Sequence, residues 1–272
     1  MCTAVLSIHP GQPLLLAGVR DELTDRAWQP PGRHWPDYPD LVGGRDLQAG
    51  GTWLAVDQDA RRVACVLNGL GQAAPPEIRR SRGELPLRAA AGLPLDRAGL
   101  AGLDPFLLLV AGTGSATLTG WDGRALSERA LGPGLHMVVN TALMSEQRGA
   151  ARRAGETISY RLGSGEAPPD GREHERARLA LFFSGFAAAA RPEPRPGGPA
   201  AGAWGAWFPL VNGNGRDPGD PAALIVRRDL GGGRVWGSTS VSLVALWPDA
   251  VRYDFCGRPG DLAAWTEVTL AG

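Results

Sequence analysis

The chain has 272 residues, of which 43% are hydrophobic and 21% charged, a composition typical of a globular protein with a sizeable core. Its 28 basic residues are balanced by 28 acidic ones, so no overall charge favours binding to nucleic acid or to an anionic membrane. All of the basic residues are arginines, which excludes chemistry through a nucleophilic or Schiff-base lysine and is typical of a GC-rich bacterial coding sequence.

The cysteines and the hydropathy pattern limit the cellular compartments in which the protein is expected. Cys2, Cys65 and Cys256 are widely separated, and no Cys/His cluster has the spacing of a zinc site or of a disulfide framework. We therefore expect no cofactor, no metal and a cytoplasmic location. No positive charge precedes the first apolar stretch, which Pro10–Pro13 interrupts, so a signal peptide is not indicated. The longest apolar run, Leu179–Ala190, is too short for an integral membrane segment.

The N-terminal half has the pattern of short strands separated by tight turns. Alternating apolar residues predict strands at Thr3–Ile8, Leu14–Val19, Gly50–Val56, Arg62–Asn68, Phe106–Ala111, Ser115–Trp121 and Leu135–Asn140. Arg26–Asp40 is rich in Pro, Trp and His, and we expect a surface loop there. Ser81–Ala91 is a helix candidate, because Ser81 and Glu84 have the spacing of a capping box.

The chain becomes more helical after Thr141, and Arg172–Ala190 is the best helix candidate. Its apolar face carries Leu179, Phe182, Phe183 and Phe186. The Pro- and Gly-rich segment 191–203 predicts a loop. Strands return at Ala223–Arg227, Gly233–Gly237, Ser240–Trp247 and Val251–Phe255. Strands before and after the helices favour an α+β fold in a single domain, residues 1–272, with both chain ends in one sheet system.

Cys2 directly follows Met1 at the start of the first predicted strand. A small second residue permits removal of Met1, which would give Cys2 a free α-amine beside its own thiol. An α-amine titrates at about 7.7–8.0 and a free thiol at about 8.5, so the amine can accept the thiol proton. The alternative interpretation is a small apolar residue on a buried strand.

Several collinear motifs resemble the NRDE family, whose best-known members are the transport-and-Golgi-organisation proteins. The motifs are Met1–Cys2, Arg20–Glu22, Gly43–Asp46, Gly50–Leu54, Val66–Asn68 and Ser81–Leu85. Trp236–Thr239 resembles that family's Tyr-Gly-Thr-Arg stretch, whereas residues 150–235 match nothing in it. Val19 stands in place of the asparagine of the name-giving motif. The C-terminal arginine is also missing, unless Arg234 or Arg252 substitutes for it.

The NRDE family is grouped with the N-terminal-nucleophile hydrolases, so the resemblance implies a four-layer αββα sandwich. The cysteine branch of that group contains the bile-salt hydrolases and penicillin V acylases. Resemblance to these enzymes implies that Cys2 is the nucleophile and that Asp21 hydrogen-bonds the new α-amine. Arg20 matches a position near that of their active-site arginine. Asn68 then matches an oxyanion-hole side chain, and Asn140 a second polar positioning group. Because adjacent strand residues point to opposite faces, we expect only one of Arg20 and Asp21 to face Cys2, namely Asp21.

Each of these residues also has a plain structural interpretation. Arg20–Glu22 can be a solvated strand end, and Asn68 can be a turn residue. Asn140 can be the N-cap of a following helix. The Gly50–Trp53 stretch can be purely structural, with its tryptophan in the core.

Three functions from different classes follow. The first is a cysteine amidohydrolase that cleaves a non-peptide C–N bond of a small-molecule amide. The second is a non-catalytic carrier of haem, of a lipid or of an acyl group. The resemblance implies it, since members of the family look linked to haem trafficking and to lipid or acyl-thioester homeostasis. The nine tryptophans suit an apolar ligand as well as a core. A haem site usually needs an axial ligand, and the sequence indicates none clearly. The third is a docking protein. No oligomeric state is indicated.

Overall fold

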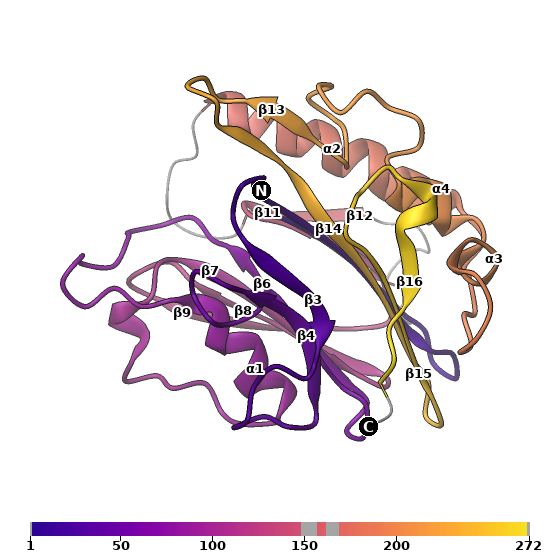
Figure 1. The fold of residues 1–272 in the computed structure, drawn as a ribbon, viewed down its shortest axis with the longest axis horizontal. Coiled ribbons are helices and arrows are strands. Elements are labelled where there is room, and N and C mark those ends of the chain that lie inside the picture. The colour runs from indigo at the N-terminus through magenta and orange to yellow at the C-terminus, as the bar shows by residue number, and fades with distance from the viewer. Residues whose placement is uncertain (1, 148–156, 162–168, 271–272) are drawn as a thin grey trace.

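Antiparallel β-sheets make up most of the structure, a computed structural model that describes residues 2–147, 157–161 and 169–270 (Figure 1). Within these residues, the first sheet combines strands from both ends of the chain. In spatial order they are β12 (Thr157–Arg161), β11 (Ala142–Gln147), β10 (Gly134–Val139), β1 (Thr3–Ile8), β2 (Leu14–Leu23), β14 (Val235–Leu246), β15 (Val251–Cys256) and β16 (Trp265–Glu267). A further short strand, β13 (Arg227–Asp229), pairs with β14.

The second sheet comes from the middle of the N-terminal half. Its strands, in chain order and in spatial order, are β3 (Trp28–Gly32), β4 (Leu41–Asp46), β5 (Leu54–Asp57), β6 (Arg62–Asn68), β7 (Phe106–Gly112), β8 (Ser115–Trp121) and β9 (Leu126–Leu131). Each strand pairs antiparallel with the next one along the chain, so this sheet is a meander of hairpins.

Helices cover the outer faces of the two sheets. Helix α1 (Leu85–Ala90) packs on β5, β6 and β7, whereas α2 (Pro169–Ala188) packs on β10. Helix α4 (Trp207–Val211) packs against α2 and α3 (Ala200–Trp204). Figure 1 shows α1 at the bottom and the other three helices at the top right, with both sheets between them. None of the described helices is long and apolar enough to cross a membrane.

Strand alternation divides the apolar side chains between separate core layers. Leu16 of β2 belongs to the largest apolar cluster, which lies between the sheets and also contains Leu109 of β7. Its neighbour Leu15 points the other way, into the cluster beneath α2, α3 and α4. Trp204 and Trp207 are fully buried in that second cluster. Trp247 belongs to the same cluster, so three of the nine tryptophans serve as core residues.

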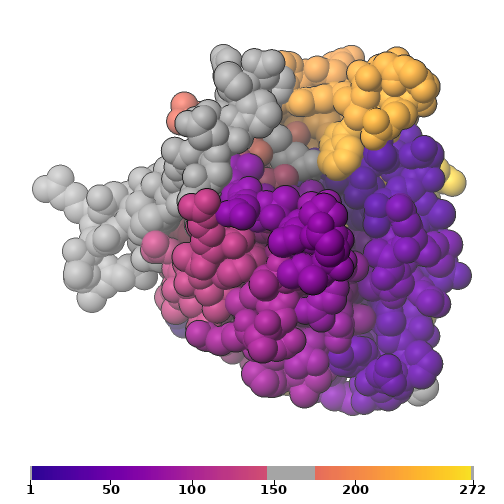
Figure 2. Space-filling view, turned by 90° about the vertical axis from the view of Figure 1, so that its left-hand side faces the viewer, coloured from indigo at the N-terminus to yellow at the C-terminus, as the bar shows by residue number. Residues whose placement is uncertain are grey.

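The pairing of β2 with β14 joins the N-terminal and C-terminal parts of the chain. The two strands are in register from Leu14–Leu246 to Leu23–Trp236, with a bulge between Ser238 and Ser240. On the face shown in Figure 2, an orange region from the later part of the chain lies next to an indigo region from its N-terminal part. The end of β2, where Arg20 and Asp21 are found, is thus held by residues more than two hundred positions away.

The structure confirms a chain of mixed α and β structure with mostly antiparallel sheets and few helices. The helix predicted at residues 81–91 is observed as α1 preceded by a 3-10 turn, Arg82–Glu84, with the Ser81 hydroxyl accepting the Gly83 N–H. The helix predicted at residues 172–190 is observed as α2.

Other predicted boundaries are wrong. The chain does not become helical directly after Thr141, because β11 and β12 come before α2. Residues 26–40 contain β3, an edge strand whose proline residues disguise it in the sequence. Residues 223–226 are buried without a strand ladder, since burial alone produces an apolar run that resembles a strand. The expected loop 191–203 includes the first residues of α3.

Candidate functional site

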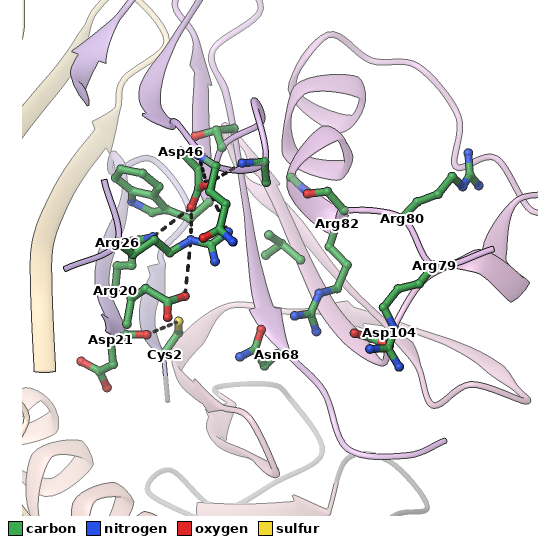
Figure 3. A pocket seen from close by; sticks show the side chains of 18 residues that line it. Cys2, Arg20, Asp21, Arg26, Asp46, Asn68, Arg79, Arg80, Arg82 and Asp104 are labelled. Atoms are coloured by element: carbon green, nitrogen blue, oxygen red, sulfur yellow. Dashed lines mark hydrogen bonds and ion pairs between the residues drawn. The ribbon is translucent and has the colours of Figure 1, made fainter. Parts of the chain in front are cut away.

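A polar cleft of about 630 Å³ opens where the ends of β1, β2, β4 and β6 meet (Figure 3). Cys2 lies on one wall, and the segment 79–83 that leads to α1 forms the opposite one. Charged residues dominate the lining, with five arginines and four acids: Arg20, Arg26, Arg79, Arg80, Arg82, Asp21, Glu22, Asp46 and Asp104. A cleft of this kind suits a polar ligand better than an apolar one.

Cys2 is half-buried in this cleft. Its Sγ lies 3.9 Å from the backbone carbonyl oxygen of Asp21, and its backbone N–H donates to Oδ1 of Asn140 at 3.1 Å. Burial raises the pKa of the Cys2 thiol; the positive charge of the chain N-terminus opposes this rise, Asp21 adds to it, and Arg20 opposes it. Since burial dominates, the thiol of the chain that still carries Met1 is protonated at neutral pH.

Arg20 and Asp21 point to opposite faces of their sheet, as neighbouring positions on β2 require. Arg20 points to the side of the cleft, where its guanidinium carbon lies 4.6 Å from the ring centroid of Trp53. The Asp21 carboxylate lies on the other side, against Arg178 of α2. The expectation that the Asp21 side chain would face Cys2 is therefore wrong, because its backbone carbonyl contacts the thiol instead (Figure 3).

Asp21 anchors a buried junction behind the nucleophile candidate. Its Oδ2 lies 3.3 Å from Nη1 of Arg178, and the two side chains are 0% and 1% exposed. Its Oδ1 accepts a hydrogen bond from Ser238 Oγ of β14 at 2.6 Å. Arg178 also donates to Thr3 Oγ1 at 3.3 Å. Three segments that are distant in sequence thereby hold Thr3, which follows Cys2, and Asp21 on the neighbouring strand.

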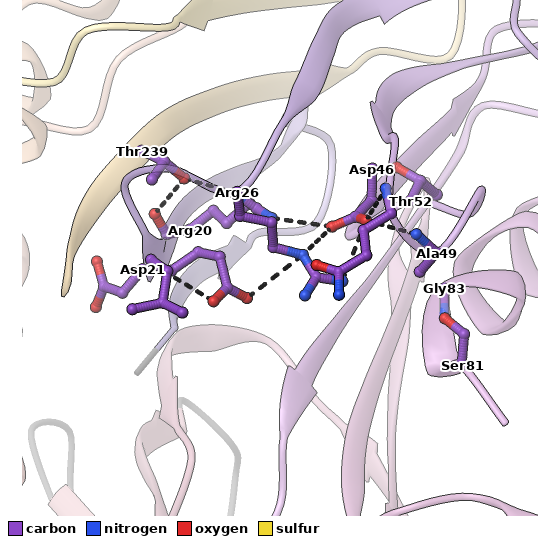
Figure 4. Close-up of polar contacts among 12 residues, drawn as sticks. Arg20, Asp21, Arg26, Asp46, Ala49, Thr52, Ser81, Gly83 and Thr239 are labelled. Atoms are coloured by element: carbon purple, nitrogen blue, oxygen red, sulfur yellow. Dashed lines mark hydrogen bonds and ion pairs between the residues drawn. The ribbon is translucent and has the colours of Figure 1, made fainter. Parts of the chain in front are cut away.

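Asp46, at the end of β4, organises the side of the cleft next to Arg20 (Figure 4). Its Oδ2 accepts hydrogen bonds from Arg20 at 3.1 Å and from Arg26 at 2.6 Å. Burial opposes ionisation of this carboxyl, but hydrogen bonds from Arg26 and the Ala49 N–H hold its pKa below the usual value. Thr239 of β14 accepts a further hydrogen bond from Arg20 at 2.8 Å. Arg20 is thus fixed by partners on both sheets.

The two asparagines occupy different positions relative to Cys2. Asn68 ends β6 and lines the cleft, and its side-chain amide has no hydrogen-bond partner among the described residues. Figure 3 shows it on the wall next to Cys2. Asn140 holds the Cys2 N–H, and it is followed by strand β11 rather than by a helix, so it is not a helix N-cap. The Asn68 amide therefore faces the cleft beside the thiol, whereas Asn140 holds the backbone nitrogen of Cys2.

Glycines bring the opposite wall close to the strands. Gly51 and Gly83 pack backbone to backbone, and a Cβ on Gly51 would collide with the Gly83 carbonyl group. The Thr52 N–H donates to that carbonyl oxygen at 2.9 Å. Gly44 has the same role beneath Trp53, since a Cβ there would collide with the indole ring. The glycines of the Gly50–Trp53 stretch therefore have the expected structural role. Trp53 packs against the core but is only half-buried, and it lines the cleft.

Glu175 of α2 is a buried carboxyl group close to the chain N-terminus. Its side chain accepts a hydrogen bond from the Thr141 hydroxyl and is 4% exposed. Burial raises the pKa of Glu175 to about 7, although Arg178 and the N-terminal positive charge oppose this. Near neutral pH this carboxyl is therefore partly protonated beside the Asp21 junction.

Sequence reasoning missed Arg178 and Glu175, and it left open whether Arg234 or Arg252 lies at the site. Among the described residues, neither Arg234 nor Arg252 lines the cleft, and Arg252 is buried against Asp254 at 2.6 Å. Arg178, from the segment without family resemblance, supplies the guanidinium beside the site. The available signal was its spacing, because Glu175, Arg178 and Phe182 follow the apolar stripe of α2 and charged residues on such a stripe need partners.

No group of three or more His, Cys, Asp or Glu side chains in the described part of the chain could hold a metal ion. Among the described residues that line the cleft, Cys2 is the one side chain of a type that ligates haem iron.

Comparison with known proteins identifies one family. A family model described as Transport and Golgi organisation 2 matches residues 1–151, more than half of the chain. A search of curated proteins found no match. The matched range contains Cys2, Arg20, Asp21, Asn68 and Asn140, whereas the residues that hold Asp21 from the other side lie outside it.

Proposed function

Because the chain belongs to the Transport and Golgi organisation 2 family, we propose that it is an N-terminal-nucleophile cysteine hydrolase. In this proposal Cys2, exposed as the first residue by removal of Met1, cleaves a non-peptide C–N amide bond. One observation carries the proposal above all: the Cys2 thiol opens into a polar cleft beside two asparagine amides, one engaged with its backbone nitrogen and one unengaged among the described residues.

The chemistry that these residues support is acyl transfer in two steps. The thiolate attacks the amide carbonyl, and the α-amine of Cys2 takes the thiol proton and returns it to the leaving nitrogen as the C–N bond breaks. Asn68 donates to the oxyanion, and loss of one such donor typically raises the barrier by about 2.7–4 kcal/mol. Water then cleaves the thioester, which releases the acid and restores the thiol.

Activation of the thiol depends on removal of Met1. With Met1 in place, burial dominates and raises the pKa of Cys2. After Met1 is removed, the α-amine and the thiol belong to the same residue, so the amine can accept the thiol proton directly or through one water. Arg20, on the same face of the sheet, already favours the thiolate.

The arrangement of the layers supports the same assignment. Two antiparallel sheets stacked face to face, with helices on both outer faces, agree with the αββα sandwich of N-terminal-nucleophile hydrolases. Since β1 and β2 share a sheet with β14 and β15, we propose that residues 1–272 act as one unit. The three unpaired cysteines support a cytoplasmic location.

The test combines intact mass with alkylation rates. We expect the expressed protein to lack Met1 and iodoacetamide to label Cys2 much faster than Cys65 or Cys256, because burial raises the pKa of Cys65 to about 12 and that of Cys256 above its usual value. The matched control carries a short N-terminal extension that keeps the Cys2 nitrogen in a peptide bond. Equal labelling rates in the two proteins, or retention of Met1, would refute the proposed mechanism.

A further inference from the structure

We propose that the cleft recognises amides that carry a carboxylate group, and that Arg82 binds this carboxylate. The inference names the ligand class of the proposed hydrolase site, so its link to turnover rests on the proposed function. The binding step itself does not.

Most charges of the cleft neutralise one another. Arg20 and Arg26 both contact Asp46, and Arg26 lies 4.0 Å from Glu22. A second pair, Arg79 and Asp104 at 3.2 Å, neutralises the far side. Asp21 turns its carboxylate toward Arg178, away from the cleft. Within the described residues, each acid of the lining therefore forms an ion pair with an arginine other than Arg80 or Arg82.

Two arginines of the lining are left without a carboxylate contact among the described residues. Arg80 is exposed at the rim and donates to the backbone oxygen of Gly99 at 2.7 Å. Arg82 is half-buried, and its Nη1 donates to the backbone oxygen of Pro105 at 2.7 Å. A guanidinium has five N–H donors, so the remaining donors of Arg82 are available to a ligand.

Burial makes Arg82 the better of the two anion sites. Burial lowers its pKa, and the more distant negative charges around it only partly offset this effect. A guanidinium that is removed from water without an ion pair gains more from an incoming anion than an exposed one does. The planar fork of an arginine can bind the two oxygens of a carboxylate through two parallel hydrogen bonds.

The position of Arg82 fits a substrate that spans the cleft. Figure 3 shows its side chain reaching down from the wall opposite Cys2 toward Asn68. A carbonyl placed between the thiol and the Asn68 amide therefore leaves one end of the substrate directed at Arg82. The wall is also pre-formed, because Gly83 packs on Gly51 and the Ser81 hydroxyl caps the turn. Such pre-organisation limits the entropy lost when the ligand binds.

The experiment measures protection of Cys2 from iodoacetamide by N-acetyl amino acids. The probes carry the carboxylate one, two or three methylene groups from the amide nitrogen, and each is compared with its neutral primary amide. We expect at least one carboxylate to protect about tenfold better than its neutral partner. Arg82→Gln should abolish this advantage, Arg82→Lys should keep part of it, and Arg80→Gln should retain it.

The outcomes separate the inference from the proposed function. The inference is wrong if no carboxylate protects Cys2 better than its neutral partner. It is also wrong if the carboxylates keep their better protection in an Arg82→Gln protein whose thermal unfolding shows that it is folded. Protection that depends on Arg82, without release of the amine product, would refute turnover but support carboxylate binding. Hydrolysis of neutral and acidic amides at equal rates in wild type and Arg82→Gln would support turnover but refute carboxylate binding by Arg82.

Discussion

Arg178→Met tests whether the buried junction behind Cys2 is needed for the fold. The substitution keeps most of the apolar stem of the side chain but leaves the Asp21 carboxylate without its guanidinium. Loss of one partner of a buried ion pair costs about 3–5 kcal/mol. Ser238 still donates to Asp21 in the variant, so we expect the lower end, about 3 kcal/mol. In a chain of this size that loss lowers Tm by roughly 6–12 °C.

Urea unfolding and thermal unfolding measure this loss directly. Arg176→Met is the matched control, because Arg176 is exposed on the same helix and its loss should cost less than about 0.5 kcal/mol. The double variant Arg178→Met with Asp21→Asn removes both charges and should recover at least half of the loss. A cost below about 1 kcal/mol for Arg178→Met, or strict additivity in the double variant, would show that the pair does not stabilise the junction.

Two further predictions concern the surroundings of the junction and the cleft wall. Since burial raises the pKa of Glu175 to about 7 from 4.5, the folded state binds more protons than the unfolded state between these values, and stability should fall as pH rises from about 4.5 to 7. Glu175→Gln should remove that slope in urea midpoints, and parallel curves for the two proteins would contradict the assignment. Gly51→Ala forces a Cβ into the Gly83 backbone and should cost about 3 kcal/mol, whereas Gly112→Ala, which meets its neighbours at 3.6 Å, should cost little. Equal unfolding midpoints for the two alanine variants would show that the Gly83 backbone can shift away from a Cβ at position 51 at little cost.

Local pattern was sufficient to predict strands that are short, largely apolar and bounded by turn residues. The strands at residues 3–8 and 62–68 were found in this way, and all of the first and most of the second are buried. Edge strands escaped: β3 contains two prolines and β9 is largely exposed, so neither has an apolar face to reveal it. The single strand β14 was divided in two because its bulge interrupts the alternation near Ser238.

Alternation also predicted that Arg20 and Asp21 diverge, but it could not say which of them shares the face of Cys2. That depends on the register between β1 and β2, in which Thr3 lies opposite Val19. With this register, Val19 and Asp21 face the helices, and Arg20 faces the cleft. In a hairpin the register follows from the turn and from which face of the strand is buried. Because both faces of β1 are buried, the apolar pattern of the sequence does not reveal this register.

The division of the site between two halves of the chain explains why the family motifs alone describe it incompletely. The matched range supplies the cleft, its thiol and its asparagines. The residues that hold Arg20 and Asp21 in opposite directions, Thr239 and Arg178, come from beyond that range. Cys2 directly precedes β1 and keeps its place only as well as the neighbouring strand β2 is held. The C-terminal part is therefore as necessary to the geometry at Cys2 as the motif-bearing part. Arg178 reaches Asp21 from α2 and so secures β2 from the face opposite the cleft.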